Sequence, residues 1–169
     1  MTKRSFQGRT WSGKNENVAV DQQQIYQGYR ATIASVSAET GIEMFKTYEY
    51  AITQWEFAYF LRALIRKNDR PLAVMMDNLN VHKTDFVKAV YEAGDIKPIF
   101  NVGYSPEFNG IEAVFSQVKR KYNMERLNKL ANDMIFDQTT EIRRAFAKIK
   151  PEVVRGCIRL CEAKLRDAL

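Results

Sequence analysis

The stretch Pro71-Leu72-Ala73-Val74-Met75-Met76-Asp77 decides the expected fold. Five apolar residues follow a proline and stop at an aspartate, a pattern typical of a strand that is buried on both faces and central in its sheet. Apolar residues at helical spacing follow at 86–91, and a second short apolar run follows at 98–102. This strand–helix–strand order predicts a parallel crossover unit.

The residues before this unit predict an antiparallel hairpin and a helix. Residues 29–38 and 42–48 alternate between apolar and polar side chains, with Glu-Thr-Gly at 39–41 as the turn. A further short strand is expected at 17–21. Large apolar residues recur at helical spacing within 53–67, which predicts a helix between the hairpin and the buried strand.

The residues from Asn109 onward are expected to be helical. Apolar positions between 111 and 122 share one helical face, and further helices are predicted at 138–149 and 151–168. The predicted fold class is therefore α/β, with a mixed sheet, antiparallel first and parallel later, flanked by helices. A length of 169 residues without repeats or an obvious linker predicts a single domain over 1–169.

The composition excludes several classes of protein. Apolar residues make up 46% and charged residues 27%, which is ordinary for a globular chain and excludes a disordered or fibrous one. No apolar run approaches the roughly 18 residues of a membrane span, so no membrane partner is expected. The polar, basic N-terminus is not a secretory signal. Two cysteines make no disulfide framework, which favours a reducing, intracellular compartment.

The positive charge lies in the C-terminal third of the chain. Residues 1–112 carry 13 basic and 13 acidic side chains, whereas residues 113–169 carry 13 basic and 7 acidic ones, so this third holds the whole net charge of +6. A one-sided basic surface suits a polyanion such as nucleic acid. The alternative is a solvated helical face, and the salt dependence of binding would distinguish the two.

Two carboxylates are the candidate chemical centre. Asp77 ends the predicted buried strand, and Glu112, after 34 intervening residues, lies in the first turn of the helix that follows the next strand. Taken alone, the first is typical of a turn and the second complements a helix dipole. A strand end and a helix start can converge in space, and two converging carboxylates can bind a divalent cation.

The sequence around these carboxylates carries a family resemblance. Residues 77–83 read D-N-x-x-x-H-K and residues 104–112 read Y-S-P-x-x-N-x-I-E. Here the chain resembles the catalytic domain of the mariner-type transposases and their bacterial insertion-sequence relatives, members of the DDE superfamily with a ribonuclease-H-like core. The resemblance covers a core from about Arg9-Thr10-Trp11 to about Tyr122, followed by a helical, basic part over about 123–169.

The resemblance implies a metal-dependent reaction on DNA. Asp77 matches the second and Glu112 the third of three acids that hold two Mg²⁺ or Mn²⁺ ions for phosphodiester hydrolysis and strand transfer. Asn78 would orient Asp77 or a metal-bound water. His82 would contact a DNA phosphate or brace the loop, with plain loop packing or helix capping as the alternative.

Further residues take supporting roles by the same resemblance. Tyr104, Ser105 and Pro106 would set the turn that aims the helix of Glu112. Asn109 would cap that helix through its side chain. Lys119 and Arg120 are candidates for phosphate contacts, although a solvated helical face is the favoured interpretation.

The chain also departs from the family pattern. The family's first acid lies on a strand shortly before the Arg-Thr-Trp segment, but none of the eight residues before Arg9 is acidic. The first strand is therefore expected to be missing or truncated, and the N-terminal helix-turn-helix region to be absent. Glu16 and Asp21 follow Trp11, align with a later strand and are poor substitutes. Gly110 replaces a proline, which loosens the helix start, and Phe115 replaces a tryptophan.

Three function classes stay open at this point. The first is a transposase-type endonuclease. Whether it is an active enzyme stays open, because its first acid is absent. The second is a non-catalytic DNA-binding or assembly module, and the third is a ribonuclease-H-type enzyme acting on RNA–DNA hybrids. The family tends to act as dimers on DNA, which implies a homodimer in the cytoplasm or nucleoid of a bacterium or the nucleus of a eukaryote. Cys157 and Cys161 lack further nearby ligands and are expected to pack.

Overall fold

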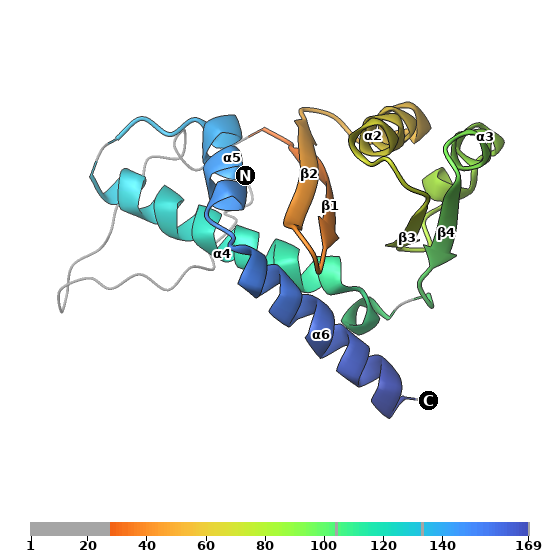
Figure 1. The fold of residues 1–169 in the computed structure, drawn as a ribbon. Helices are drawn as coiled ribbons and strands as arrows, with labels where there is room; N and C mark the ends of the chain where they lie inside the picture. The colour runs from red at the N-terminus through yellow and green to blue at the C-terminus, as the bar shows by residue number, and fades with distance from the viewer. Residues whose placement is uncertain (1–27, 104, 133, 169) are drawn as a thin grey trace.

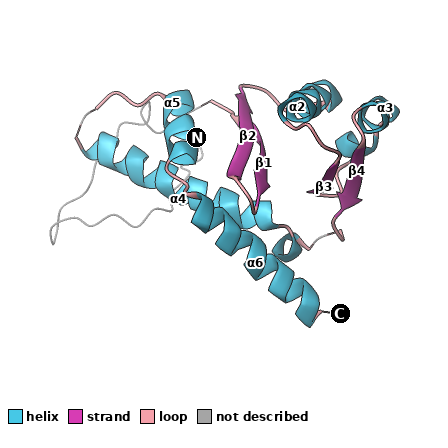
Figure 2. Ribbon diagram, in the orientation of Figure 1, coloured by secondary structure: helices cyan, strands magenta, loops and turns pink. Residues whose placement is uncertain are grey.

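The computed structural model describes residues 28–103, 105–132 and 134–168 (Figure 1). The chain folds, in order, into β1 (Ala31–Ser37), β2 (Gly41–Tyr48), α2 (Gln54–Lys67), β3 (Leu72–Met76), η1 (Asn80–Lys83), α3 (Asp85–Ala93), β4 (Ile96–Phe100), η2 (Pro106–Phe108), α4 (Gly110–Ala131), α5 (Gln138–Ala147) and α6 (Pro151–Asp167). An antiparallel pair of strands is followed by a parallel pair, with helices around them (Figure 2). The predicted α/β class is confirmed and is consistent with a ribonuclease-H-like fold.

The predicted hairpin is present as β1 and β2, which pair antiparallel from Ala31↔Tyr48 to Ser37↔Gly41. Gly41 closes the turn with φ 92, and a Cβ there would meet the Cα of Pro151 at 3.0 Å. Only glycine therefore fits both the backbone conformation and the close approach of α6. The strand predicted at 17–21 lies outside the described residues.

The parallel crossover unit is also confirmed, with β3 and β4 paired in register Val74↔Pro98 and α3 between them. β4 begins at Ile96, two residues earlier than predicted, because Asp95 turns the chain at φ 48 and its carbonyl accepts the Leu72 N–H at 3.2 Å.

The expected burial of β3 on both faces is wrong within the described residues. Ala73 and Met75 are exposed, Met75 by 43%, and β3 has β4 as its one neighbour there. The apolar run is explained by the other face of β3. On that face Leu72, Val74 and Met76 pack against apolar residues of α2 and α3.

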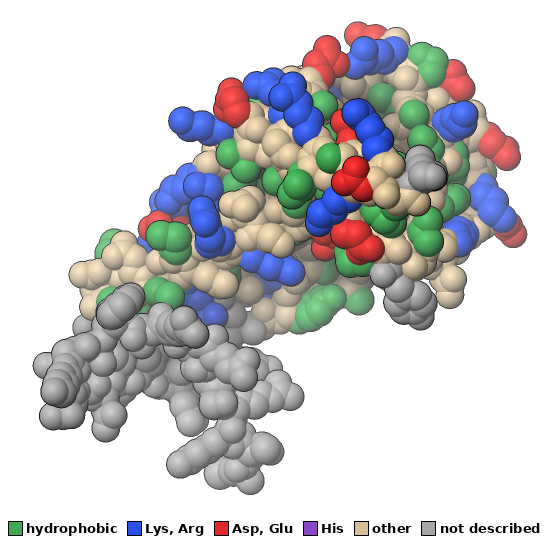
Figure 3. Space-filling model, turned by 90° about the horizontal axis from the view of Figure 1, so that it is seen from below, with side chains coloured by type: hydrophobic (Ala, Val, Ile, Leu, Met, Phe, Trp, Pro, Cys, Tyr) green, Lys and Arg blue, Asp and Glu red, His purple; other side chains and the backbone are tan. Residues whose placement is uncertain are grey.

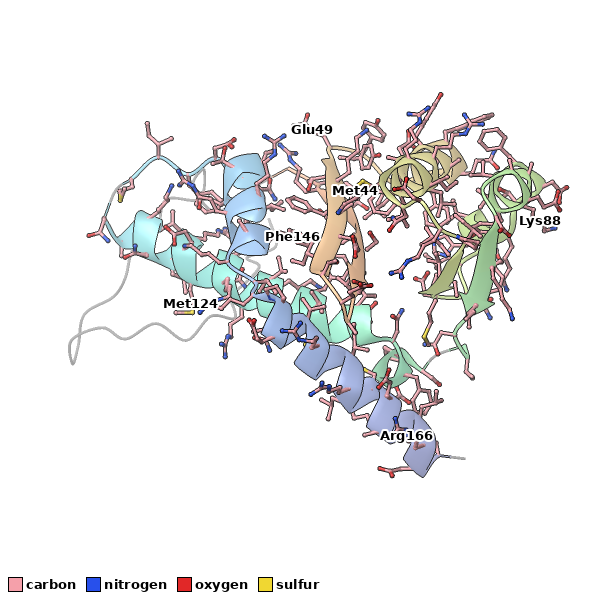
Figure 4. All side chains as sticks on the ribbon, viewed as in Figure 1. Met44, Glu49, Lys88, Met124, Phe146 and Arg166 are labelled. Carbon is pink, nitrogen blue, oxygen red and sulfur yellow. The ribbon has the colours of Figure 1, made fainter. Side chains whose placement is uncertain are left out.

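Two hydrophobic clusters hold the elements together. The first joins α2, α3, β3 and β4 and contains Phe57, Ala58, Leu61, Met76, Val87, Val90, Tyr91 and Ile96. The second joins α4, α5 and α6 and contains Val114, Val118, Ala145, Phe146, Ile149 and Val154. Phe146 projects toward β2 (Figure 4) and stacks on Phe45 with ring centroids 4.2 Å apart.

Strand β1 contacts both clusters through its two faces. Ile33 packs against the first cluster, whereas Ala34 and Val36 pack against the second. Because alternate residues of a strand point to opposite faces, the two clusters lie on opposite sides of β1. Of the described helices, none is long and apolar enough to cross a membrane.

Candidate functional site

A cleft of about 830 Å³ lies between the two pairs of strands. It is lined by β1, by β3 and by the start of α4, and both Asp77 and Glu112 lie on its wall. Figure 1 shows β1 and β3 as the inner strands of the two pairs, so the cleft separates the antiparallel pair from the parallel pair. The two predicted carboxylates therefore lie on one cleft and not on opposite sides of the molecule.

Asp77 follows directly on β3, and the loop after it is braced by His82. The His82 Nδ1 lies 3.0 Å from the Asp77 carboxylate and 3.1 Å from its backbone oxygen. Both partners accept hydrogen bonds, so Nδ1 carries the proton in this arrangement. The buried imidazole packs on the Phe57 ring at 4.1 Å. The Asp77 side chain is still 47% exposed, so it is oriented by the histidine without being closed off from the cleft.

Glu112 lies exposed in the first turn of α4, where the helix start is well defined. The buried Asn109 caps the helix, its side-chain oxygen accepting the Ile111 N–H at 3.4 Å, as the sequence predicts. Gly110 does more than loosen this turn. A Cβ at this position would lie 3.2 Å from Cγ1 and 3.3 Å from Cα of Ile158, so glycine lets α6 pack against the start of α4.

A family model described as DDE superfamily endonuclease matches residues 1–135. The chain belongs to the DDE superfamily endonucleases. No match was found among curated proteins. The matched part of this endonuclease contains both carboxylates of the cleft and every described strand, whereas α5 and α6 lie beyond it. The family therefore supports a transposase-type nuclease in general, with DNA as the class of substrate.

Two residues that the sequence analysis missed order the loops beside Asp77 and before α4. The Tyr91 hydroxyl donates to the His82 carbonyl oxygen at 3.0 Å and to the Met76 sulfur at 3.2 Å. Burial raises the pKa of Tyr91 from 10.0 to about 12, so this hydroxyl keeps its proton at pH values where an exposed tyrosine loses it. The sequence did contain a signal for this role. A tyrosine on the apolar face of a helix is expected to be buried, and a buried hydroxyl needs a hydrogen-bond partner.

The second missed residue is Asn101, which follows β4 and orders the turn before α4. Its buried side chain donates to the Ser105 carbonyl oxygen at 2.7 Å and accepts the Val102 N–H at 2.9 Å. Pro106 then opens η2. Tyr104 lies outside the described residues. The asparagine was overlooked because nothing in the sequence indicates that this position is buried.

The remaining predicted residues are exposed. Asn78 follows Asp77 at the cleft, and Lys119 and Arg120 lie on α4 seven and eight residues after Glu112. On the face seen in Figure 3, Lys and Arg side chains lie among acidic and hydrophobic ones and form no unbroken patch.

Part of the positive charge is also used inside the fold. The buried Lys129 forms an ion pair with Glu141 at 2.6 Å, which joins α4 to α5. This lysine therefore contributes to the packing of the helices and adds nothing to a surface for nucleic acid.

The carboxylate oxygens of Asp77 and Glu112 are of the chemical type that Mg²⁺ and Mn²⁺ prefer as ligands. Over residues 28–103, 105–132 and 134–168, however, no three His, Cys, Asp or Glu side chains come together. Asp77 and Glu112 thus make an incomplete ligand set.

Cys161 is buried in α6 and burial raises the pKa of its thiol, which agrees with the packing role expected for it.

Proposed function

We propose that this DDE superfamily endonuclease cleaves and joins DNA phosphodiester bonds in transposition, in the manner of the mariner-type and insertion-sequence enzymes. The observation that supports this best is the position of Asp77 and Glu112 on one cleft, although 34 residues lie between them in the chain. Asp77 follows β3, which packs in the first hydrophobic cluster, whereas Glu112 lies in α4, which packs in the second.

Each carboxylate has a defined part in this proposal. Asp77 and Glu112 would hold Mg²⁺ or Mn²⁺, whose chemistry in such sites is activation of the attacking hydroxyl and stabilisation of the leaving oxygen. His82 lies 3.0 Å from one oxygen of Asp77 and would orient the carboxylate, whose side chain is 47% exposed and so accessible to a cation. Asn78, exposed beside Asp77, would orient that carboxylate or a bound water.

Exposed basic residues near the cleft would position the DNA. Lys119 and Arg120 lie two turns after Glu112 on the same helix, within reach of a backbone that runs along α4. Contacts of this kind fix the register of DNA without reading its sequence. Their contribution depends on salt, because each neutralised phosphate releases counterions.

The test is nicking of supercoiled plasmid DNA by the full chain with Mn²⁺. Asp77→Asn and Glu112→Gln should each lower the nicking rate by at least about 100-fold, because each removes a metal-binding charge. Asp85→Asn and Glu107→Gln are matched controls, since both carboxylates are exposed and lie outside the cleft lining. Nicking that Asp77→Asn leaves unchanged would come from a contaminant and would contradict the proposal.

One observation favours a second candidate, a non-catalytic DNA-binding or assembly module. Among the described residues no three acidic, histidine or cysteine side chains come together, whereas the family mechanism uses three acids. Such a module binds DNA with a strong salt dependence and shows no cleavage with either metal. Preferential cleavage of an RNA–DNA hybrid over duplex DNA would instead indicate a ribonuclease-H-type enzyme.

A further inference from the structure

The outer face of α2 carries a stripe of aromatic and basic side chains. Trp55, Tyr59, Arg62 and Arg66 follow one another at intervals of three or four residues, so they lie on one side of the helix. Trp55 is 50% exposed and Tyr59 62%, and both arginines are exposed. Tryptophan, tyrosine and arginine are the residue types that contribute most to binding at protein interfaces. The composition of this stripe is therefore that of a binding surface.

A groove of about 260 Å³ lies beside the stripe, between α2 and α3. Figure 1 shows these two helices side by side. The apolar part of the groove lining consists of Ile65, Phe86, Ala89, Val90 and Ala93. Val90 belongs to the first hydrophobic cluster, so the floor of the groove is part of the core. The exposed alanines are small, which leaves the groove open to side chains of another molecule.

Both ends of the groove are closed by contacts between the helices. At one end the Trp55 ring lies 4.3 Å from the Phe86 ring, and the Arg62 guanidinium lies 5.9 Å from the same ring. At the other end Ile65 lies over Gly94, where a Cβ would be 2.8 Å from its Cγ1. The helix rises about 16 Å between residues 55 and 66. The groove therefore matches about three turns of a helix laid along it.

The charge of the groove is positive. Arg62 and Arg66 both line it, and its lining includes no aspartate or glutamate. The described residues give neither arginine an ion-pair partner, whereas the next basic residues, Lys67 and Arg70, pair with acids of the hairpin. A guanidinium binds a carboxylate through two parallel hydrogen bonds. An apolar groove with two arginines on its rim is therefore complementary to apolar side chains flanked by carboxylates.

We propose that the groove between α2 and α3 binds an acidic amphipathic helix of a partner protein. The apolar side chains of that helix, at positions i, i+4 and i+7, seat on Ala89 and Ala93. Its flanking carboxylates pair with Arg62 and Arg66, and its end packs on Trp55. The groove and the cleft of Asp77 share no lining residue, so the partner binds without occupying the cleft. The inference thus goes beyond the proposed function and does not rest on it.

The shape of the groove favours a protein helix over nucleic acid. Duplex DNA is read by elements that protrude into its grooves, and its backbone is bound by several basic side chains together. A hollow with an apolar floor and two arginines offers neither feature. The volume is also smaller than the roughly 300–1,000 Å³ of sites for small molecules and cofactors. Apolar anchors of a peptide remain as the ligand that this hollow fits.

Titration of the full chain with synthetic helical peptides, followed by NMR, tests the proposal. Three peptides share leucines at i, i+4 and i+7 and differ only in the flanking residues, which are all Glu, all Gln or all Lys. We expect the Glu peptide to shift the amide signals of Ala89 and Ala93 and the indole signal of Trp55. It should bind at least about 10-fold more tightly than the Gln peptide, and the Lys peptide should not bind.

A pair of double variants isolates the part of the two arginines. Arg62→Gln/Arg66→Gln should abolish the preference for Glu over Gln, because both guanidinium groups are removed. Arg143→Gln/Arg159→Gln is the matched control, since these exposed arginines lie on α5 and α6, and it should keep the preference. All four positions are exposed, so these substitutions leave the hydrophobic clusters intact.

Absence of shifts at Ala89 and Ala93 with the Glu peptide would overturn the proposal. Equal binding of the Glu and Lys peptides would do so too, as would a preference for Glu that survives Arg62→Gln/Arg66→Gln. Shifts produced there by a DNA duplex but not by the Glu peptide would assign the groove to nucleic acid. Shifts that grow with protein concentration alone would assign it to a second copy, and either result contradicts the proposal. No metal or cleavage enters this experiment, so its outcome is independent of the nuclease test.

Discussion

The two pairs of strands are stabilised in different ways, although each has two strands. β2 is covered by helices from the C-terminal part, with Phe45 stacked on Phe146 and Gly41 against Pro151. β3 packs on α2 and α3 by one face and leaves Met75 exposed on the other. The pair that carries Asp77 is therefore the less covered one. The candidate site therefore depends on how the two halves are held together, because each half provides one carboxylate.

The largest expected effects come from breaking either cluster. Leu61→Ala in the first cluster and Phe146→Ala in the second should lower the free energy of unfolding by about 2–5 and about 3–5 kcal/mol, respectively. Because β1 packs against both clusters, we expect one cooperative transition for each variant. Urea titrations followed by fluorescence of Trp55, in a Trp11→Phe background, and by far-UV circular dichroism check this. Midpoints that differ between the two signals would show that the halves unfold independently.

A smaller effect is expected at the loop of Asp77. Tyr91→Phe leaves the buried His82 carbonyl without its donor and should cost about 1–3 kcal/mol of unfolding free energy. The pH dependence has a definite sign. The pKa of Tyr91 is raised from 10.0 to about 12, so its contribution is complete below pH 10 and is lost as pH rises toward 12. Between pH 9 and 12 the free energy of unfolding should fall less steeply with pH for Tyr91→Phe than for the unmodified chain. An unchanged slope would contradict this assignment.

The smallest effect is expected at the start of α4. Asn109→Ala removes the cap of the helix that carries Glu112 and should cost about 1 kcal/mol. Asn109→Ser is the matched control, because serine caps almost as well. Thermal unfolding of the three proteins measures this difference. A loss as large in Asn109→Ser as in Asn109→Ala would show that the buried asparagine acts through packing and not through its hydrogen bond.

The type and order of the hairpin, the crossover unit and the helices followed from local sequence patterns. Period-two and period-3.6 patterns identified the hairpin, the crossover unit and the helices, because these periods follow from local backbone geometry. The family motifs also singled out Asp77 and Glu112, and the capping role of Asn109 followed from residue type and position alone.

Which strand faces are covered, among the described residues, became known from the packing of the elements. An apolar run such as 72–76 cannot say whether a neighbour covers both faces, since that depends on segments distant in the chain. The brace from Tyr91 through His82 to Asp77 and the turn ordered by Asn101 arise from contacts between residues that the local pattern does not connect. Local sequence carries no record of such contacts, because burial and pairing are set by the whole fold.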